Sequence, residues 1–167
     1  MVTAVEDAVR MGVDCIKMLL PWQVSDVEKV QYCKRIGKVV GEAAKWDMPV
    51  MVEPVFLNQA RSPEIIEAEL EVARVGYDLG ADIIKITFPG ADATAKLCAE
   101  LDIPIVVAGG PKSGDAKSTL RDISDSIEAG AQGVVVGRKI WQRPEAEAAD
   151  MIKEIAKITR KSYKRRW

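Results

Sequence analysis

Short apolar stretches alternate along this chain with longer amphipathic ones. Five runs have the length and apolar character of strands and lie at 13–20, 49–55, 82–88, 104–108 and 133–137. The segments between them space their apolar residues as helices do and lie at 25–45, 62–79, 91–100, 117–129 and 144–161. Strands that are apolar on both faces and alternate with helices indicate a parallel sheet covered by helices.

Local signals support several of these helix boundaries. Ser62-Pro63 predicts a capped helix start with proline at the first helical position, and Arg143-Pro144 predicts another start. Gly80 and Gly130 stand where a helix would end before the next strand. These signals make the alternation of helices and strands more specific.

An internal repeat indicates the type of α/β fold. The stretch from Gly12 to Lys17 (GVDCIK) closely matches the stretch from Gly80 to Lys85 (GADIIK), and the stretch from Gly130 to Val135 (GAQGVV) is a third copy. A second pattern, DMPVMV at 47–52 and DIPIVV at 102–107, lies between the copies. Repeated βα units of this kind favour a (β/α)₈ TIM barrel over an open sheet.

Five βα units cannot close a barrel of eight strands, and the remaining sheet edges would be exposed. A helical segment at 3–11 resembles the end of a further unit whose strand is absent. We therefore expect residues 1–167 to form a single partial domain, the C-terminal five βα units of an incomplete (β/α)₈ barrel. The first three units would be missing, supplied by another chain, or lost to a misplaced start.

Composition narrows the possible chemistry. The chain has no histidine, which excludes Ser-His-Asp and Cys-His nucleophile systems and most zinc-hydrolase chemistry. A net charge of −1 and the lack of a long apolar run favour neither nucleic acid nor a membrane as partner. Three widely spaced cysteines and no signal peptide indicate reduced thiols in the cytoplasm. We expect neither a metal nor a cofactor.

Three charged residues interrupt the apolar strands. In a barrel strand, alternate residues point inward. At 82–88 the more apolar set should face the helices, so Lys85 points into the barrel. The same parity sends Lys17 and Glu53 inward from the two preceding strands. Three neighbouring strands would thus each direct one ionisable group to a shared interior.

This trio suits Schiff-base chemistry. Desolvation disfavours the charged form of an interior lysine, and only a neutral amine attacks a carbonyl. Lys17 would strengthen this effect at Lys85 by like-charge repulsion, and Glu53 could move protons. The alternative is that the three residues form only a buried ion-pair network.

Two loops have the character of a phosphate site. Gly109-Gly110-Pro111-Lys112-Ser113-Gly114 follows one strand, and Arg138 follows the next. Glycines let backbone N–H groups approach an anion, and basic side chains add charge. Loops after the last two strands are the usual phosphate site of this barrel. The alternative is ordinary turn chemistry.

These motifs together resemble a known family. GADIIKI with Lys85, VVAGGPKSG with Gly109 and Gly110, and GAQGVVVGRKIWQRPEA with Gly137 and Arg138 are similar to archaeal-type class I fructose-bisphosphate aldolases and their deoxyribose-phosphate aldolase relatives. The resemblance implies that Lys85 forms the Schiff base. It also implies that the Gly109-Gly110 loop and Gly137 with Arg138 bind substrate phosphate.

Two departures from this pattern bear on mechanism. Val55 stands where archaeal-type fructose-bisphosphate aldolases have a catalytic tyrosine. The segment with Glu53 instead resembles the tagatose-bisphosphate and sulfofructose-phosphate branch, which implies that Glu53 is the acid–base group and that Lys17 is an active-site lysine. The family's first strand carries a catalytic aspartate, and no such strand is found here.

The sequence thus predicts a class I aldolase that acts on a phosphorylated ketose such as fructose or tagatose bisphosphate, as a homo-oligomer. One rival is a transferase or thiolase of the same family. Another is a truncated, non-catalytic barrel fragment that binds phosphorylated sugars. Lys17 either contacts substrate or only tunes its neighbour.

Overall fold

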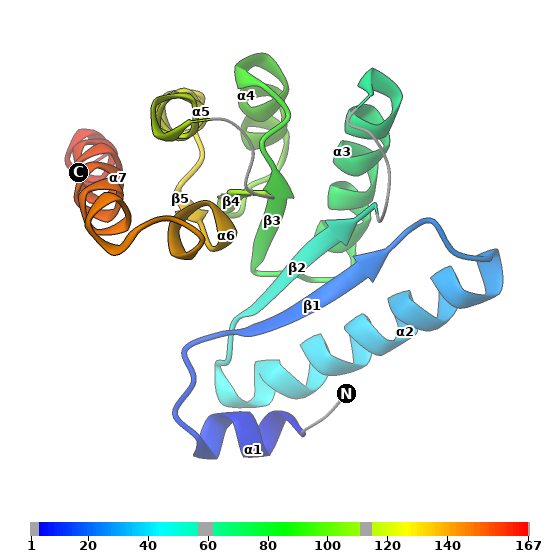
Figure 1. Cartoon of the computed structure of the whole chain (residues 1–167). Helices are drawn as coiled ribbons and strands as arrows, with labels where there is room; N and C mark the ends of the chain where they lie inside the picture. The colour runs from blue at the N-terminus through cyan, green and yellow to red at the C-terminus, as the bar shows by residue number, and fades with distance from the viewer. Residues whose placement is uncertain (1–3, 57–61, 111–114, 167) are drawn as a thin grey trace. The chain divides into compact units, whose positions relative to one another are not determined.

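The computed structural model describes residues 4–56, 62–110 and 115–166. It divides into two compact units, Met1–Lys85 and Ile86–Trp167. Strands and helices alternate in both (Figure 1). The five strands are parallel to their neighbours within each unit, so the predicted parallel α/β class is confirmed.

The first unit contains three strands in sequence order. Its elements are α1 (Val5–Arg10), β1 (Ile16–Pro21), α2 (Asp26–Ala43), the 3₁₀ turn η1 (Ala44–Trp46), β2 (Val50–Val55), α3 (Pro63–Asp78) and β3 (Ile83–Thr87), which ends beyond the boundary. Figure 1 shows α2 alongside β1, and α3 packs on β2.

Local sequence explains the ends of α3. The Ser62 hydroxyl accepts the Ile65 N–H and proline occupies the first turn, as predicted. At the other end Gly80 has φ +89°, a left-handed conformation that glycine adopts without strain. Its N–H donates to Tyr77 O and that of Ala81 donates to Gly76 O, which closes the helix.

The core of this unit lies between the strands and α3. Val52 and Ile84 are fully buried. A Cβ atom added to Gly76 would lie 3.0 Å from Ile84 Cδ1 and 3.1 Å from Val52 Cγ1, so the helix backbone lies directly on these side chains. The helices therefore cover the face of the strands that carries the even-numbered residues.

The second unit contains two strands, and β4 pairs with β5. Its elements are α4 (Ala91–Glu100), β4 (Ile105–Ala108), α5 (Ala116–Glu128), β5 (Gly133–Val135), α6 (Arg138–Trp141) and α7 (Glu145–Arg166). Helix α5 packs against α7. Ile105 and Leu97 are fully buried.

Most element boundaries agree with the sequence prediction, with four differences. α7 continues to Arg166 rather than ending at residue 161. β1 begins at Ile16 rather than at residue 13, because the preceding residues form the turn after α1. β5 ends at Val135 rather than at residue 137, and the short helix α6 that follows was not predicted.

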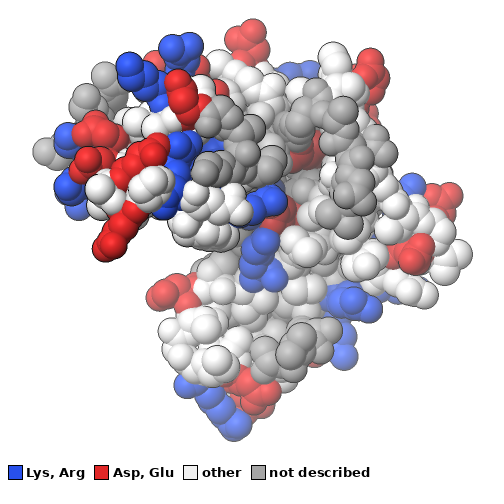
Figure 2. All heavy atoms as spheres, in the orientation of Figure 1, with Lys and Arg blue, Asp and Glu red and all other residues white. Residues whose placement is uncertain are grey.

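Figure 2 shows basic and acidic side chains interspersed on the visible face. Throughout the described ranges, every helix is too short or too polar to cross a membrane.

Candidate active site

Glu53 in β2 lies between two lysines. Its Oε1 atom is 3.0 Å from Lys85 Nζ in β3, and its Oε2 atom forms an ion pair with Lys17 Nζ in β1. Each carboxylate oxygen therefore has one ammonium partner. The structure brings together all three charged residues that strand parity placed on one face.

The strand register explains this arrangement. β2 pairs with β3 so that Met51 lies opposite Ile83, which places Glu53 opposite Lys85 two residues further along. β1 pairs with β2 so that Lys17 lies opposite Met51, and Lys17 therefore reaches Glu53 along the diagonal. The three side chains share the strand face opposite to α3.

The three side chains differ in their exposure to solvent. The exposed fraction is 11% for Lys85, 18% for Glu53 and 44% for Lys17. Lys85 is thus the most enclosed amine, and its nearest described counter-ion is Glu53. A carboxylate that contacts an enclosed amine at hydrogen-bond distance can accept a proton from it or return one, which is the geometry required of an acid–base partner.

The predicted glycine residues of the second unit lie at the ends of β4 and β5. The Gly109 N–H donates to Val135 O at 3.1 Å, so the two strand ends lie side by side. A Cβ atom at Gly109 would lie 2.9 Å from Val136 Cγ1, whereas Gly110 has open space around it and φ +69°. Both positions therefore favour glycine, one for packing and the other for backbone conformation.

Gly137 and Arg138 stand where β5 turns into α6. A Cβ atom at Gly137 would lie 2.5 Å from Trp141 Cζ3, so only glycine fits beneath this ring. The Gly137 carbonyl accepts the Ile140 N–H, which starts the helix. The sequence prediction missed α6 because a helix of four residues gives no readable periodicity. The available signal was that Gly137 and Trp141 stand four residues apart in the sequence.

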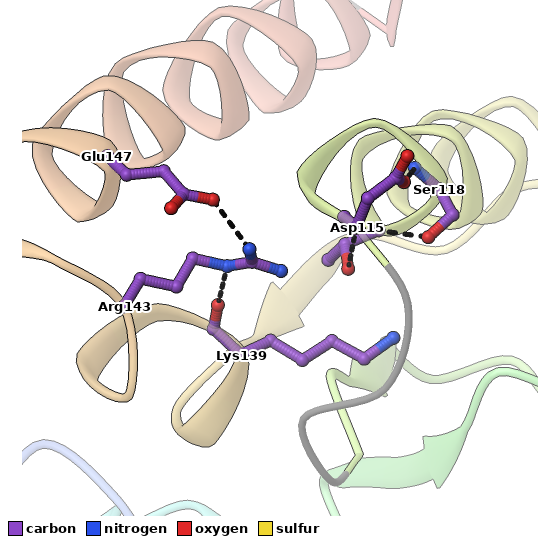
Figure 3. Close-up of polar contacts among 6 residues, drawn as sticks. Asp115, Ser118, Lys139, Arg143 and Glu147 are labelled. Atoms are coloured by element: carbon purple, nitrogen blue, oxygen red, sulfur yellow. Dashed lines mark hydrogen bonds and ion pairs between the residues drawn. The ribbon is translucent and has the colours of Figure 1, made fainter.

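A set of polar contacts holds α6 against α7 (Figure 3). Arg143 Nε donates to Lys139 O at 2.6 Å, and its NH1 group donates to Glu147 Oε1 at 2.6 Å. Lys139 Nζ is 3.7 Å from Asp122 Oδ2 on α5. These contacts fix the turn that carries Gly137, because they anchor the helix that begins there.

Asp115 caps α5 directly after the Gly109-Gly110 loop. Its Oδ1 atom accepts the Ser118 N–H at 2.7 Å, as Figure 3 shows. This backbone hydrogen bond lowers the pKa of Asp115, with the Ser118 hydroxyl contributing further. The remaining predicted loop residues, 111–114, lie outside the described residues.

Other features of the described residues do not add to the site. A surface hollow of about 370 Å³ lies along α2, and it is lined by Lys34, Arg35, Lys38, Val39 and Glu42. It includes none of the predicted site residues. Within the described part of the chain, no group of three His, Cys, Asp or Glu side chains could hold a metal ion.

The family comparison agrees with the parallel α/β fold. The model of the DeoC/LacD family aldolases matches residues 1–143, and the chain belongs to this family. The family resemblance of the sequence motifs is thereby confirmed.

Individual relatives are longer than this chain. An aldolase of Saccharolobus solfataricus is 30% identical over 158 residues, which are 92% of this chain and 57% of the relative. A 2-amino-4,5-dihydroxy-6-oxo-7-(phosphonooxy)heptanoate synthase of Streptomyces griseus is 30% identical over 161 residues, 93% of this chain and 57% of that enzyme. The chain thus spans a little over half of these relatives.

A solved structure confirms the fold class. The Schiff-base-forming fructose-1,6-bisphosphate aldolase superposes with a TM-score of 0.79 and 26% identity, over 92% of this chain and 63% of that one. The neighbouring structures are TIM-barrel aldolases, and the chain has the fold of part of such a barrel.

Proposed function

We propose that this protein is a class I aldolase that cleaves or forms a carbon–carbon bond through a Schiff base on Lys85. The observation that carries the proposal is the contact of Glu53 Oε1 with Lys85 Nζ at 3.0 Å, on the most enclosed lysine of the group. Family membership and the similarity to a Schiff-base-forming aldolase support it.

The proposed steps use only this chain's side chains. Lys85 passes an ammonium proton to Glu53, and the resulting neutral amine attacks the keto carbon of the substrate. Glu53 returns that proton to the hydroxyl group that leaves as water, and an iminium ion remains. The bond between the α and β carbons of the iminium then breaks, and its electrons form the carbon–carbon double bond of an enamine. Glu53 takes the proton from the hydroxyl group that becomes the aldehyde. Protonation of the enamine and hydrolysis by water then restore Lys85.

Lys17 contributes positive charge beside Glu53. Its ion pair with Oε2 orients the carboxylate, and its 44% exposure leaves it accessible to substrate oxygens. We infer that Lys17 orients Glu53 and contacts the polar groups of the substrate. The second role distinguishes it from Lys85, which forms the covalent bond.

Phosphate recognition is assigned to the second unit. We propose that the Gly109-Gly110 loop and Gly137 with Arg138 hold a substrate phosphate, with backbone N–H groups at Gly110 and Gly137 and the Arg138 guanidinium as donors. The Gly109 N–H is already bonded to Val135 O, so Gly109 contributes by keeping the turn free of a side chain. The packing constraints on Gly109 and Gly137 support this assignment, because they keep the backbone free of side chains at these turns.

The proposed substrate is a phosphorylated ketose such as fructose or tagatose bisphosphate. Fructose 1,6-bisphosphate is the substrate of the similar solved enzyme. The Glu53 and Lys17 pattern favours the tagatose-bisphosphate branch, and Val55 occupies the place of the tyrosine of the other branch. We further propose that the enzyme works in the cytoplasm as a homo-oligomer.

Trapping of the imine tests the mechanism. The 167-residue chain is incubated with dihydroxyacetone phosphate and reduced with sodium borohydride, and the modified peptide is identified by mass spectrometry. The expected adduct lies on Lys85 and is absent from Lys85→Met. Lys17→Arg, which keeps the charge, should still be trapped. A folded chain whose Lys85 stays unmodified would refute the proposal.

A synthase activity is the second candidate, because the Streptomyces griseus relative is named as a synthase of a phosphorylated heptanoate. Product analysis separates the two possibilities. Dihydroxyacetone phosphate with an aldehyde acceptor should yield a phosphorylated ketose if the chain is an aldolase. Trapping on Lys85 without aldol product would favour the synthase, and phosphosugar binding without either result would indicate a non-catalytic fragment.

A further inference from the structure

The junction between a helix and the next strand is built in the same way three times. Gly12, Gly80 and Gly130 all have positive φ and all end a helix. In each case the glycine N–H donates to a carbonyl three residues earlier, and the next N–H donates to a carbonyl five residues earlier. The residues two positions after these glycines, Asp14, Asp82 and Gln132, are therefore equivalent.

In two of the three junctions, those of Asp82 and Gln132, this residue forms two hydrogen bonds with the first residue of the neighbouring strand. Asp82 Oδ2 accepts the Val50 N–H at 2.8 Å, and the Asp82 N–H donates to Val50 O at 2.9 Å. Gln132 Oε1 accepts the Ile105 N–H at 2.9 Å, and the Gln132 N–H donates to Ile105 O at 2.8 Å. A carboxylate and a side-chain amide thus both accept the N–H of the first strand residue.

The partner residue also has the same setting in both copies. Val50 follows Pro49, Ile105 follows Pro104, and each begins its strand. Both are fully buried, so their N–H groups need the acceptor that the following junction supplies. This pair of hydrogen bonds therefore binds the first residue of a parallel strand.

Asp14 occupies the equivalent position in the first junction but does not form the equivalent hydrogen bonds. It is exposed, and its carboxylate has no hydrogen-bond partner among the described residues. β1 pairs with β2 on one side and is the edge strand of the first unit. Exposed apolar side chains lie near this edge, with Val13 37% and Leu19 48% exposed.

We propose that Asp14 is the docking point for the first residue of a parallel β-strand supplied from outside these 167 residues. The Asp14 carboxylate accepts that residue's N–H, and the Asp14 N–H donates to its carbonyl. The incoming strand then extends along the open side of β1 by main-chain hydrogen bonds. Its expected pattern is a proline followed by apolar residues.

A second copy of this chain does not fit this role. Its two strands of the required pattern begin at Val50 and Ile105, and the N–H groups of both are already taken by Asp82 and Gln132. The relatives extend well beyond the part that this chain matches, so related proteins possess further segments. The proposal is independent of the proposed catalytic function.

A tethered strand tests the docking. A second copy of residues 45–55, which contains the Pro49-Val50 strand, is fused ahead of Met1 through a flexible linker of about 15 residues, the length that a parallel crossover requires. Hydrogen exchange is then measured at the amides of Lys17 and Leu19. Because the Ile16 N–H donates to Pro49 O, strand alternation places these two amides on the open side of β1.

The fusion should slow exchange at these two amides at least about tenfold, a factor that corresponds to about 1.4 kcal/mol. Asp14→Ala should abolish the protection, and Asp14→Asn should retain most of it, since the Gln132 amide performs the same task. Val50→Pro in the added copy alone removes the recognised N–H and should act like Asp14→Ala. Asp92→Ala, an exposed carboxylate on α4, is the matched control and should change nothing.

Unchanged exchange at Lys17 and Leu19 in a folded fusion would overturn the proposal. Equal protection in the Asp14→Ala fusion would also overturn it. Protection of these amides in the unfused chain together with the mass of a dimer would show that a second copy occupies the edge, against the proposal.

Discussion

The Oε1 atom of Glu53 and the Nζ atom of Lys85 lie 3.0 Å apart on neighbouring strands, and the second oxygen of the same carboxylate pairs with Lys17. One carboxylate therefore compensates two amines, of which only Lys17 is substantially exposed. Because Lys85 is enclosed and Lys17 is exposed, we expect the two lysines to have different roles. It also makes Glu53 the residue whose loss should have the broadest effect.

Glu53→Gln should separate charge from shape at this position. The amide keeps a similar size, but it can no longer accept a proton. We expect kcat to fall about 10²–10⁴-fold, the usual contribution of a positioned acid–base group, with a much smaller change in KM. Steady-state cleavage assays measure both constants. Unchanged kcat would remove Glu53 from the proposed mechanism.

The same substitution should lower stability, because Lys85 is largely enclosed and loses its counter-ion. We expect the free energy of unfolding to fall by about 1–3 kcal/mol. Urea denaturation at neutral pH measures this change. Glu67→Gln, on the exposed face of α3, is a matched control that should change stability by less than about 0.5 kcal/mol.

Lys17→Met and Lys85→Met should differ in kind. Lys85→Met should lose activity and imine trapping together, because the nucleophile is gone. Lys17→Met should still be trapped by borohydride, while its activity falls about tenfold or more through loss of orientation at Glu53. Mass spectrometry of the reduced protein and the rate of cleavage give the two readouts. If Lys17→Met lost imine trapping while Lys85→Met kept it, Lys17 rather than Lys85 would be the lysine that forms the Schiff base.

Strand parity predicted the lysine–carboxylate group because it depends only on alternation within each strand. Lys85 is polar in the run 82–88, and the neighbouring Ile84 and Ile86 are fully buried as the pattern requires. The contacts themselves depend on the strand register. The register places Glu53 opposite Lys85 but diagonal to Lys17, and hydrophobic pattern alone does not specify it.

The end of β5 was less predictable, for a different physical reason. The run 133–137 is apolar throughout, yet strand pairing stops at Val135, where the chain turns toward α6. That turn depends on the packing of Trp141 over Gly137 and on the contacts of Arg143 with Lys139. Such tertiary contacts leave no periodic signal in a sequence.

Asp82 should stabilise the first unit through the Val50 N–H. Val50 is fully buried, so Asp82→Ala would leave this donor unsatisfied and should cost about 1–3 kcal/mol. Asp82→Asn retains an acceptor oxygen and should cost less than half as much. Urea denaturation compares the two variants. An equal loss in both would indicate that the charge, rather than the hydrogen bond, is what matters.

Gly109 and Gly110 should respond differently to alanine. At Gly109 the added Cβ atom meets Val136 Cγ1 at 2.9 Å and the Val136 backbone at 3.3 Å, so Gly109→Ala should destabilise the fold by about 1–3 kcal/mol. At Gly110 there is open space and the cost is conformational, about 1–2 kcal/mol. If the loop binds phosphate, Gly110→Ala should also raise KM. Gly37→Ala, in an open helical position, is the control for both variants.

Cys15 should react slowly with alkylating reagents. Burial raises the pKa of this thiol above its ordinary value of 9.0, a backbone hydrogen bond with Met51 opposes the rise, and the nearby Asp82 charge adds to it. The thiolate is the reactive form, so iodoacetamide should modify the Cys15 peptide more slowly than free cysteine at pH 8.

Because the pKa of Cys15 is raised in the folded chain, the stabilisation linked to its neutral thiol is complete below the pKa of the unfolded chain. It is lost as pH rises through the pKa of the folded chain. Cys15→Ala should therefore flatten the alkaline limb of the stability profile. In urea the Cys15 peptide should react at the rate of free cysteine, and equal rates in the native and unfolded chain would contradict the raised pKa.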